Sequence, residues 1–127
     1  MIRRHFLQAL PALALTGCVS PSREPPAIVF FEADSAALAG PGTEIVRRAA
    51  TVAARHPGAV VRVLGFADTD GSRRFSQALS RARAEHVADL LRQAGVAGER
   101  IRVSARGPVA FEMAEQESRR VEIHLGE

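Results

Sequence analysis

Two side chains of opposite charge, Asp68 and Arg83, stand fifteen positions apart near the middle of this 127-residue chain. Asp68 follows a predicted strand, and Arg83 lies in a predicted helix that would double back across the end of that strand. A carboxylate accepts hydrogen bonds from an ammonium group, and a guanidinium forks onto a carboxylate. The residue types leave other interpretations open: a turn or cap role for the acid, a surface position for the arginine, or an ion pair between them that binds nothing.

Cys18 is the single cysteine of the chain, so an internal disulfide is excluded. The four histidines are scattered along the sequence, and we therefore predict no metal site and no cofactor. The segment Leu15–Cys18 reads LTGC and resembles the bacterial lipobox, in which the cysteine is linked to diacylglycerol and becomes the first residue of the mature protein. An inert, buried cysteine is the alternative.

The segment before Cys18 has the plan of a secretory signal peptide. Two arginines come first, and the apolar run from Phe6 to Leu15 that follows is shorter than the ~20 residues that span a bilayer. We predict a lipoprotein signal peptide over residues 1–18; an amphipathic helix of the mature protein is the alternative. The stretch RRHFL also resembles a twin-arginine export signal, and ordinary secretion remains open beside it. The residue after Cys18 is Val19 and not an Asp, which favours placement of the lipoprotein in the outer membrane of a Gram-negative cell.

The rest of the chain divides into a short linker and one domain. Residues 19–27 are rich in Pro and Ser without apolar periodicity, which is typical of an extended linker. Residues 28–127 are enough to bury a core without a metal or a disulfide. Apolar patterning predicts strands at 28–31, 60–66, 100–105 and 120–125, and helices at 43–56 and 74–93. The order β-α-β-α-β-β predicts an α+β fold, with two main helices packed on one face of a mixed four-stranded sheet.

Composition and motifs argue against two classes of function. The net charge is only +3, the basic residues form no run, and no Trp or Tyr offers a stacking platform, so we predict no nucleic-acid binding. No nucleophile elbow, HExxH motif or phosphate-binding loop occurs. Asp68 and Asp70 fit the paired acids of a glycosidase poorly, because they stand two positions apart on one loop. We predict that the protein is not an enzyme.

Three blocks of the sequence resemble the OmpA-like domain family. The central block begins at Gly65 with GFADTDGS and continues through FSQALS to Arg83 and the alanine and valine that follow it. The opening block IVFFEADS resembles the first strand and turn of the family, and the closing block SRRVEI resembles its last strand. The three blocks stand in the family's order and cover about residues 28–125.

The resemblance implies a fold and a ligand. The fold would be the family's βαβαββ sandwich, and the ligand would be the diaminopimelate residue of the peptidoglycan stem peptide, whose end carries an ammonium and a carboxylate on one carbon. Asp68 would accept from the ammonium, and Arg83 would fork onto the carboxylate. By the same resemblance, the ligand site would also include Asp34, Asp70, Ser76 and Arg119. Replacing Asp68 or Arg83 would then weaken binding while changing folding far less.

The functional hypothesis is a non-catalytic lipoprotein on the periplasmic face of the outer membrane, which tethers that membrane to peptidoglycan through the lipid on Cys18. Tol-type or other envelope proteins are further candidate partners, although no stretch marks a docking site for them. The segment Gly107–Glu117 is shorter than in typical members of the family. This difference supports an alternative, an OmpA-like accessory lipoprotein that has lost peptidoglycan binding and acts through protein–protein interaction.

Overall fold

The computed structural model describes residues 24–126, so the predicted signal peptide, Cys18 and residues 19–23 of the predicted linker lie outside the described residues. Two long helices and four strands follow one another in the predicted order. The strands are β1 (Ala27–Phe30), β2 (Val61–Ala67), β3 (Ile101–Pro108) and β4 (Arg120–Leu125). The helices are α1 (Gly40–Arg55) and α2 (Arg73–Gln93), with two short 3-10 helices, η1 (Gly98–Arg100) and η2 (Glu115–Ser118).

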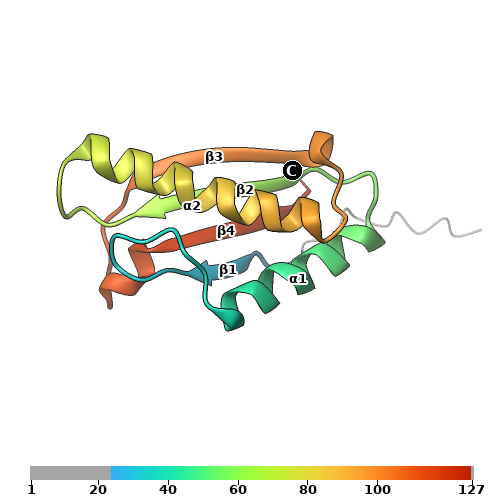
Figure 1. The fold of residues 1–127 in the computed structure, drawn as a ribbon, viewed down its shortest axis with the longest axis horizontal. Coiled ribbons are helices and arrows are strands. Elements are labelled where there is room, and N and C mark those ends of the chain that lie inside the picture. The colour runs from blue at the N-terminus through green and yellow to red at the C-terminus, as the bar shows by residue number, and fades with distance from the viewer. Residues whose placement is uncertain (1–23, 127) are drawn as a thin grey trace, which may run out of the picture.

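The strands form one mixed sheet in the order β1-β4-β2-β3 (Figure 1). β2 and β3 are parallel and are joined by α2, whereas β4 is antiparallel to both β1 and β2. The last strand therefore inserts between the first two. Its first residue, Arg120, pairs with Phe30 at the end of β1, and Val121 pairs with Gly65 near the end of β2. This insertion brings three chain segments to one end of the sheet.

Both helices pack on the same face of that sheet (Figure 1). The apolar stripe of α2 buries Ala84, Val87, Ala88 and Leu91, and that of α1 buries Val46, Ala50 and Ala53. The sheet supplies fully buried valines at positions 29, 63 and 121. The predicted α+β class with its helices on one face is confirmed. Among the described residues, neither helix is long and apolar enough to cross a membrane.

The element ends differ from the predicted ones for local reasons. α1 begins at Gly40 rather than at residue 43, because Pro41 fits the first turn of a helix, where a backbone N–H has no partner. β3 runs on to Pro108, because a shift in register after Gly65 lets Ala67 pair with Pro108. The two 3-10 helices were not predicted, since pieces of three and four residues leave no apolar period.

Arg100 closes the C-terminal end of α1. Its Nη2 donates to the backbone oxygens of Ala53 and His56 at 3.0 and 2.7 Å, and its Nε donates to Ala59 O at 3.0 Å. The last carbonyls of a helix have no partner within it, so a cation that binds them stabilises its end. An arginine beside β3 thus fixes the end of a helix that precedes it by more than forty residues.

Gly65 sets the distance between α2 and β2. A methyl group on its Cα would lie 2.0 Å from Ser80 O and 2.9 Å from the Cβ of Ala84, both on the buried face of α2. We expect Gly65→Ala to push the helix off the sheet and to lower the free energy of unfolding by ~1–3 kcal/mol, the usual cost of overpacking. Urea denaturation measures this loss. Gly58→Ala is the control, because nothing lies within 4 Å of the added methyl there, and equal midpoints for the two variants would contradict the expectation.

Candidate ligand-binding site

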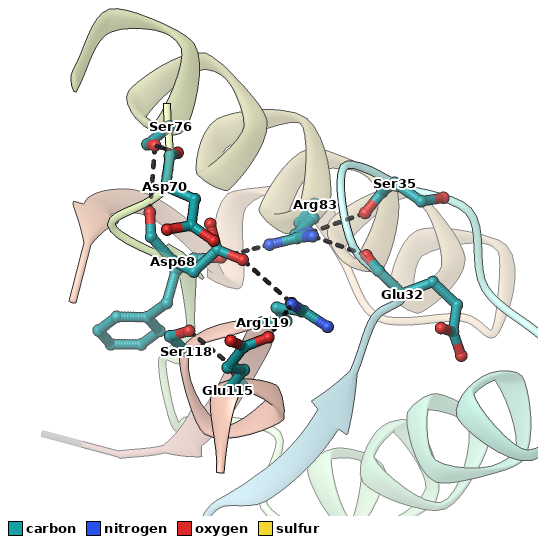
Figure 2. Close-up of polar contacts among 10 residues, drawn as sticks. Glu32, Ser35, Asp68, Asp70, Ser76, Arg83, Glu115, Ser118 and Arg119 are labelled. Atoms are coloured by element: carbon teal, nitrogen blue, oxygen red, sulfur yellow. Dashed lines mark hydrogen bonds and ion pairs between the residues drawn. The ribbon is translucent and has the colours of Figure 1, made fainter. Parts of the chain in front are cut away.

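The predicted site residues gather at the end of the sheet where β2 leads into α2 (Figure 2). Asp68 directly follows β2, Ser76 and Arg83 lie on α2, and Arg119 directly precedes β4. Asp34 lies on the loop between β1 and α1. The insertion of β4 between β1 and β2 explains why segments so far apart in sequence meet here.

Arg83 is completely buried. Its Nε donates to Ser35 O at 2.8 Å, its Nη2 to Glu32 O at 2.9 Å, and its Nη1 to Phe66 O at 3.1 Å. The guanidinium carbon lies 5.3 Å from the centre of the Phe31 ring. The side chain therefore fastens the β1–α1 loop to the end of β2.

This arrangement bears on the role predicted for Arg83. The sequence-based prediction was a guanidinium that forks onto a ligand, but each of its three nitrogens donates to a backbone oxygen and none is exposed. Burial lowers the pKa of Arg83, the nearby charge of Asp68 opposes that effect, and Arg119 adds to it. No hydrogen bond joins Asp68 and Arg83 among the described residues, so Asp68 acts on the arginine through its charge.

Asp68 pairs instead with Arg119. The Nε of Arg119 donates to Oδ2 of Asp68 at 3.0 Å, and both side chains keep some exposure, 18% for the arginine and 14% for the acid. This hydrogen bond is the main reason that the pKa of Arg119 is raised above its ordinary value. The other carboxylate oxygen, Oδ1, accepts no hydrogen bond from the residues that the structure describes. The accessible charge pair of the site is thus Asp68 with Arg119, not Asp68 with Arg83.

Ser76 is buried and holds the loop that carries Asp68. Its hydroxyl lies 3.1 Å from Asp68 O and 3.4 Å from Asp70 O, so its one hydrogen is shared between two backbone oxygens. With 2% of its surface exposed, Ser76 supports the loop from within the fold. Ser72 adds a second restraint, because its side chain caps α2 by accepting from Phe75 N at 3.1 Å.

Asp34 and Asp70 are exposed and add negative charge at the rim of the site. Asp34 has a φ of 54°, in the left-handed region that Asp tolerates better than most residues do. It lies between Glu32 and Ser35, whose backbone oxygens Arg83 holds, and its charge acts on Arg83. Both acids remain candidates for contact with a cationic group.

One side chain of the site was not predicted. Glu115 accepts from Nη2 of Arg119 at 2.9 Å, and its own side chain is 59% exposed. It stands four positions before Arg119 in η2, and the buried hydroxyl of Ser118 donates to its backbone oxygen at 2.7 Å. The spacing of four residues between Glu115 and Arg119 is present in the sequence, but the segment has no apolar period that would predict a helix and so bring the two side chains together. Within residues 24–126, no group of three or more metal-binding side chains gathers.

A second charged cluster lies on the opposite face of the sheet, where Arg120, Glu122 and His124 alternate with buried residues of β4. Arg120 Nε donates to Glu122 at 2.9 Å, and His124 Nε2 contacts the other carboxylate oxygen at 2.9 Å. Burial alone would raise the pKa of Glu122, but the hydrogen bonds with His124 and Arg120 outweigh it and hold that pKa below its ordinary value.

This cluster predicts a pH dependence of stability. Because the pKa of Glu122 is lower in the folded state than in the unfolded one, its charge stabilises the fold at neutral pH. That contribution is lost as the pH falls from the ordinary pKa of glutamate through the lower folded value. We expect Glu122→Gln to be less stable than the parent at neutral pH and to approach it in acid. Urea denaturation across that range tests this, and parallel curves for the two proteins would contradict it.

The comparisons with known proteins agree with the geometry. Residues 30–121 match the model of the OmpA family. The chain belongs to the OmpA family. The three sequence blocks that resemble the family correspond to β1 and its turn, to the β2–α2 junction and to the start of β4.

Two curated relatives illustrate the family likeness. The chain is 37% identical over 101 residues to "Peptidoglycan-associated lipoprotein" of Legionella pneumophila, an alignment that covers 75% of this chain and 57% of that protein. It is 33% identical over 103 residues to "Probable lipoprotein YiaD" of Escherichia coli K12, covering 76% and 47%. The chain thus spans about half the length of these relatives.

Solved structures support the fold. The peptidoglycan-associated lipoprotein of Burkholderia pseudomallei superposes with a TM-score of 0.71 at 22% identity, covering 87% of this chain and 98% of that one. The C-terminal domain of Helicobacter pylori MotB superposes with a TM-score of 0.70 at 26% identity, covering 80% and 84%. The arrangement of two helices on a mixed four-stranded sheet is therefore that of an OmpA-like domain.

Proposed function

We propose that this protein is a non-catalytic lipoprotein of the cell envelope that binds peptidoglycan. Family membership and relatives named peptidoglycan-associated lipoprotein support the class of function. The observation that carries the assignment to a site is the partly exposed Asp68 carboxylate, which lies beside Arg119 and has one oxygen that accepts no hydrogen bond from residues 24–126.

In the proposed binding mode, the ammonium of a diaminopimelate end donates to Asp68, and its carboxylate meets Arg119. The ammonium approaches the free Oδ1 and adds a donor to the existing ion pair. Arg119 has Asp68 and Glu115 as partners, and a ligand carboxylate replaces the exposed Glu115 most readily, because a solvated ion pair contributes little. Asp34 and Asp70 reinforce attraction for the cationic end.

Arg83 and Ser76 position this site in our proposal, instead of touching the ligand. Arg83 fixes the backbone on both sides of the pocket, at Glu32 and Ser35 and at Phe66. Ser76 fixes the loop that carries Asp68.

Anchoring remains a sequence-based part of the proposal. Lipid on Cys18 would hold the protein at the periplasmic face of the outer membrane, and the chain from Cys18 to Ile28 would reach at most ~35 Å. β1 begins at Ala27, so the wall-binding domain would stay close to that membrane. A Tol-type or other envelope partner is compatible with this placement. Mass spectrometry of Cys18 for an acyl modification tests the anchor.

The binding proposal is tested by sedimentation with purified sacculi. We expect the protein to sediment with sacculi and to be released by free diaminopimelate. Nα-acetyl-lysine amide is the matched competitor, because its side chain ends in an amine and none of its carbons carries both an ammonium and a carboxylate. Release by diaminopimelate at concentrations where this lysine derivative is inactive supports the proposal. A protein that stays in solution contradicts it.

One observation favours a second function. Asp68 is already paired and Arg83 is fully enclosed, as expected of an OmpA-like accessory lipoprotein that has lost its ligand and acts through protein–protein interaction. The shortened segment Gly107–Glu117 points the same way. In that case, sedimentation with sacculi would be absent, and crosslinking in the envelope would capture a protein partner at the same end of the sheet.

A further inference from the structure

The exposed side of α2 carries a shallow groove of about 660 Å³, lined by Arg73, Arg74, Gln77, Ala78 and Arg81. These residues define what we call the α2 arginine groove. Positions 74, 77, 78 and 81 recur at three and four residues and therefore lie along one side of the helix. Gln77 is held against the neighbouring strand, because its amide donates to Ala105 O at 3.0 Å. The polar groups through which the groove could bind a ligand are therefore the guanidinium groups of its three arginines.

The charges of the groove are not balanced within the described part of the chain. None of the three arginines makes an ion pair there, whereas Arg47, Arg92, Arg119 and Arg120 each have an acidic partner. Two of them also stand in the first turn of α2, which contains no acid. The N-terminal end of a helix favours negative charge, so arginines there are electrostatically unfavourable until an anion joins them.

The groove starts close in sequence to the proposed peptidoglycan site. It begins one residue after Ser72, the cap of α2, at the end of the loop that carries Asp68 and Asp70. The buried hydroxyl of Ser76 ties this part of the helix to the same loop. Figure 1 shows α2 lying across β2 and β3, with its first turns beyond the end of β2. From Arg73 the groove extends ~12 Å along the helix, at 1.5 Å per residue.

We propose that the α2 arginine groove binds carboxylates of peptidoglycan stem peptides as a second contact, next to the site at Asp68. The inference rests on the proposed function, because the ligand held at Asp68 brings the rest of the wall polymer alongside α2. Free carboxylates of the stems are anions to which guanidinium groups fork. The first site selects a zwitterionic end, and the groove adds attraction for the polymer that carries it.

The test compares two triple variants with equal change in charge. The variant Arg73→Gln/Arg74→Gln/Arg81→Gln removes the groove, and Arg47→Gln/Arg48→Gln/Arg55→Gln removes three exposed arginines of α1. Sedimentation with sacculi is measured at low and at high sodium chloride, and thermal unfolding checks that both variants fold. We expect about tenfold weaker binding at low salt for the groove variant only, because exposed charge pairs contribute modestly and are screened by salt.

The groove variant should also respond less to salt than the parent does. A third variant, Arg73→Lys/Arg74→Lys/Arg81→Lys, retains the charge and should keep most of the salt-dependent binding. Equal binding of the groove and α1 variants overturns the inference and leaves the proposed function standing. If the parent protein does not sediment with sacculi, the proposed function is wrong, and the groove proposal that rests on it is wrong as well. The inference is also overturned if the parent and the α1 variant bind phosphatidylglycerol vesicles and the groove variant does not. That result would assign the three arginines to contact with a membrane surface.

Discussion

The variant Asp68→Asn should lose nearly all sedimentation with sacculi. Asparagine keeps the size of the side chain but removes the charge that we expect to meet the ligand ammonium, and it weakens the pair with Arg119. Removing one partner of a desolvated charge pair costs ~2–5 kcal/mol, which weakens binding from about thirtyfold to several thousandfold. Titration of sacculi against a fixed protein concentration measures the change.

Glu115→Gln is the matched control for this variant. Glu115 also pairs with Arg119, but its side chain is 59% exposed and an exposed pair contributes little. We expect this control to bind within about threefold of the parent. If both variants bind equally well, Asp68 is not a ligand residue and the site assignment fails. If both lose binding, Arg119 and its pairing, rather than the Asp68 charge, determine affinity.

The fold was largely predictable because its signals are local. Alternating apolar residues in β2 and β4 and the apolar stripes of α1 and α2 give the type and order of each element. The sheet order was not available from those patterns. The insertion of β4 between β1 and β2 depends on pairing across some ninety residues with β1 and some sixty residues with β2, which no local period reports.

The sequence indicated which residues lie together at this end of the sheet but not the contacts among them, and their role toward a ligand stays a prediction. Asp68 and Arg119 meet because β4 starts beside the ends of β1 and β2, so the sequence marked the residues without marking their contacts. Arg83 illustrates the limit most clearly. The family resemblance predicts a ligand role for Arg83, whereas the acceptors that the structure gives its guanidinium are backbone oxygens, which leave no trace in a sequence.

Arg83→Leu should destabilise the fold strongly, in contrast to the sequence-based expectation that folding would change far less. The leucine removes the guanidinium donor from the oxygens of Glu32, Ser35 and Phe66, and of these Glu32 O keeps a weaker hydrogen bond from the backbone N–H of Ser35. A buried polar group that loses its partner costs ~1–3 kcal/mol, and the three share one location, so we expect a loss of ~3–5 kcal/mol. Against a typical total of ~5–15 kcal/mol, this is a large part of the stability. Urea denaturation measures it.

Arg81→Leu separates this effect from the loss of an arginine as such. Arg81 lies two residues earlier on the same helix and is exposed, so its replacement should change stability by no more than ~0.5 kcal/mol. A similar small change for Arg83→Leu would mean that the three backbone oxygens find water or other donors, and that the guanidinium is free to meet a ligand after all. A large loss of stability together with weaker binding of the remaining folded protein is the result expected if Arg83 positions the pocket. A large loss of stability with intact binding would mean that Arg83 stabilises the fold without positioning the ligand site.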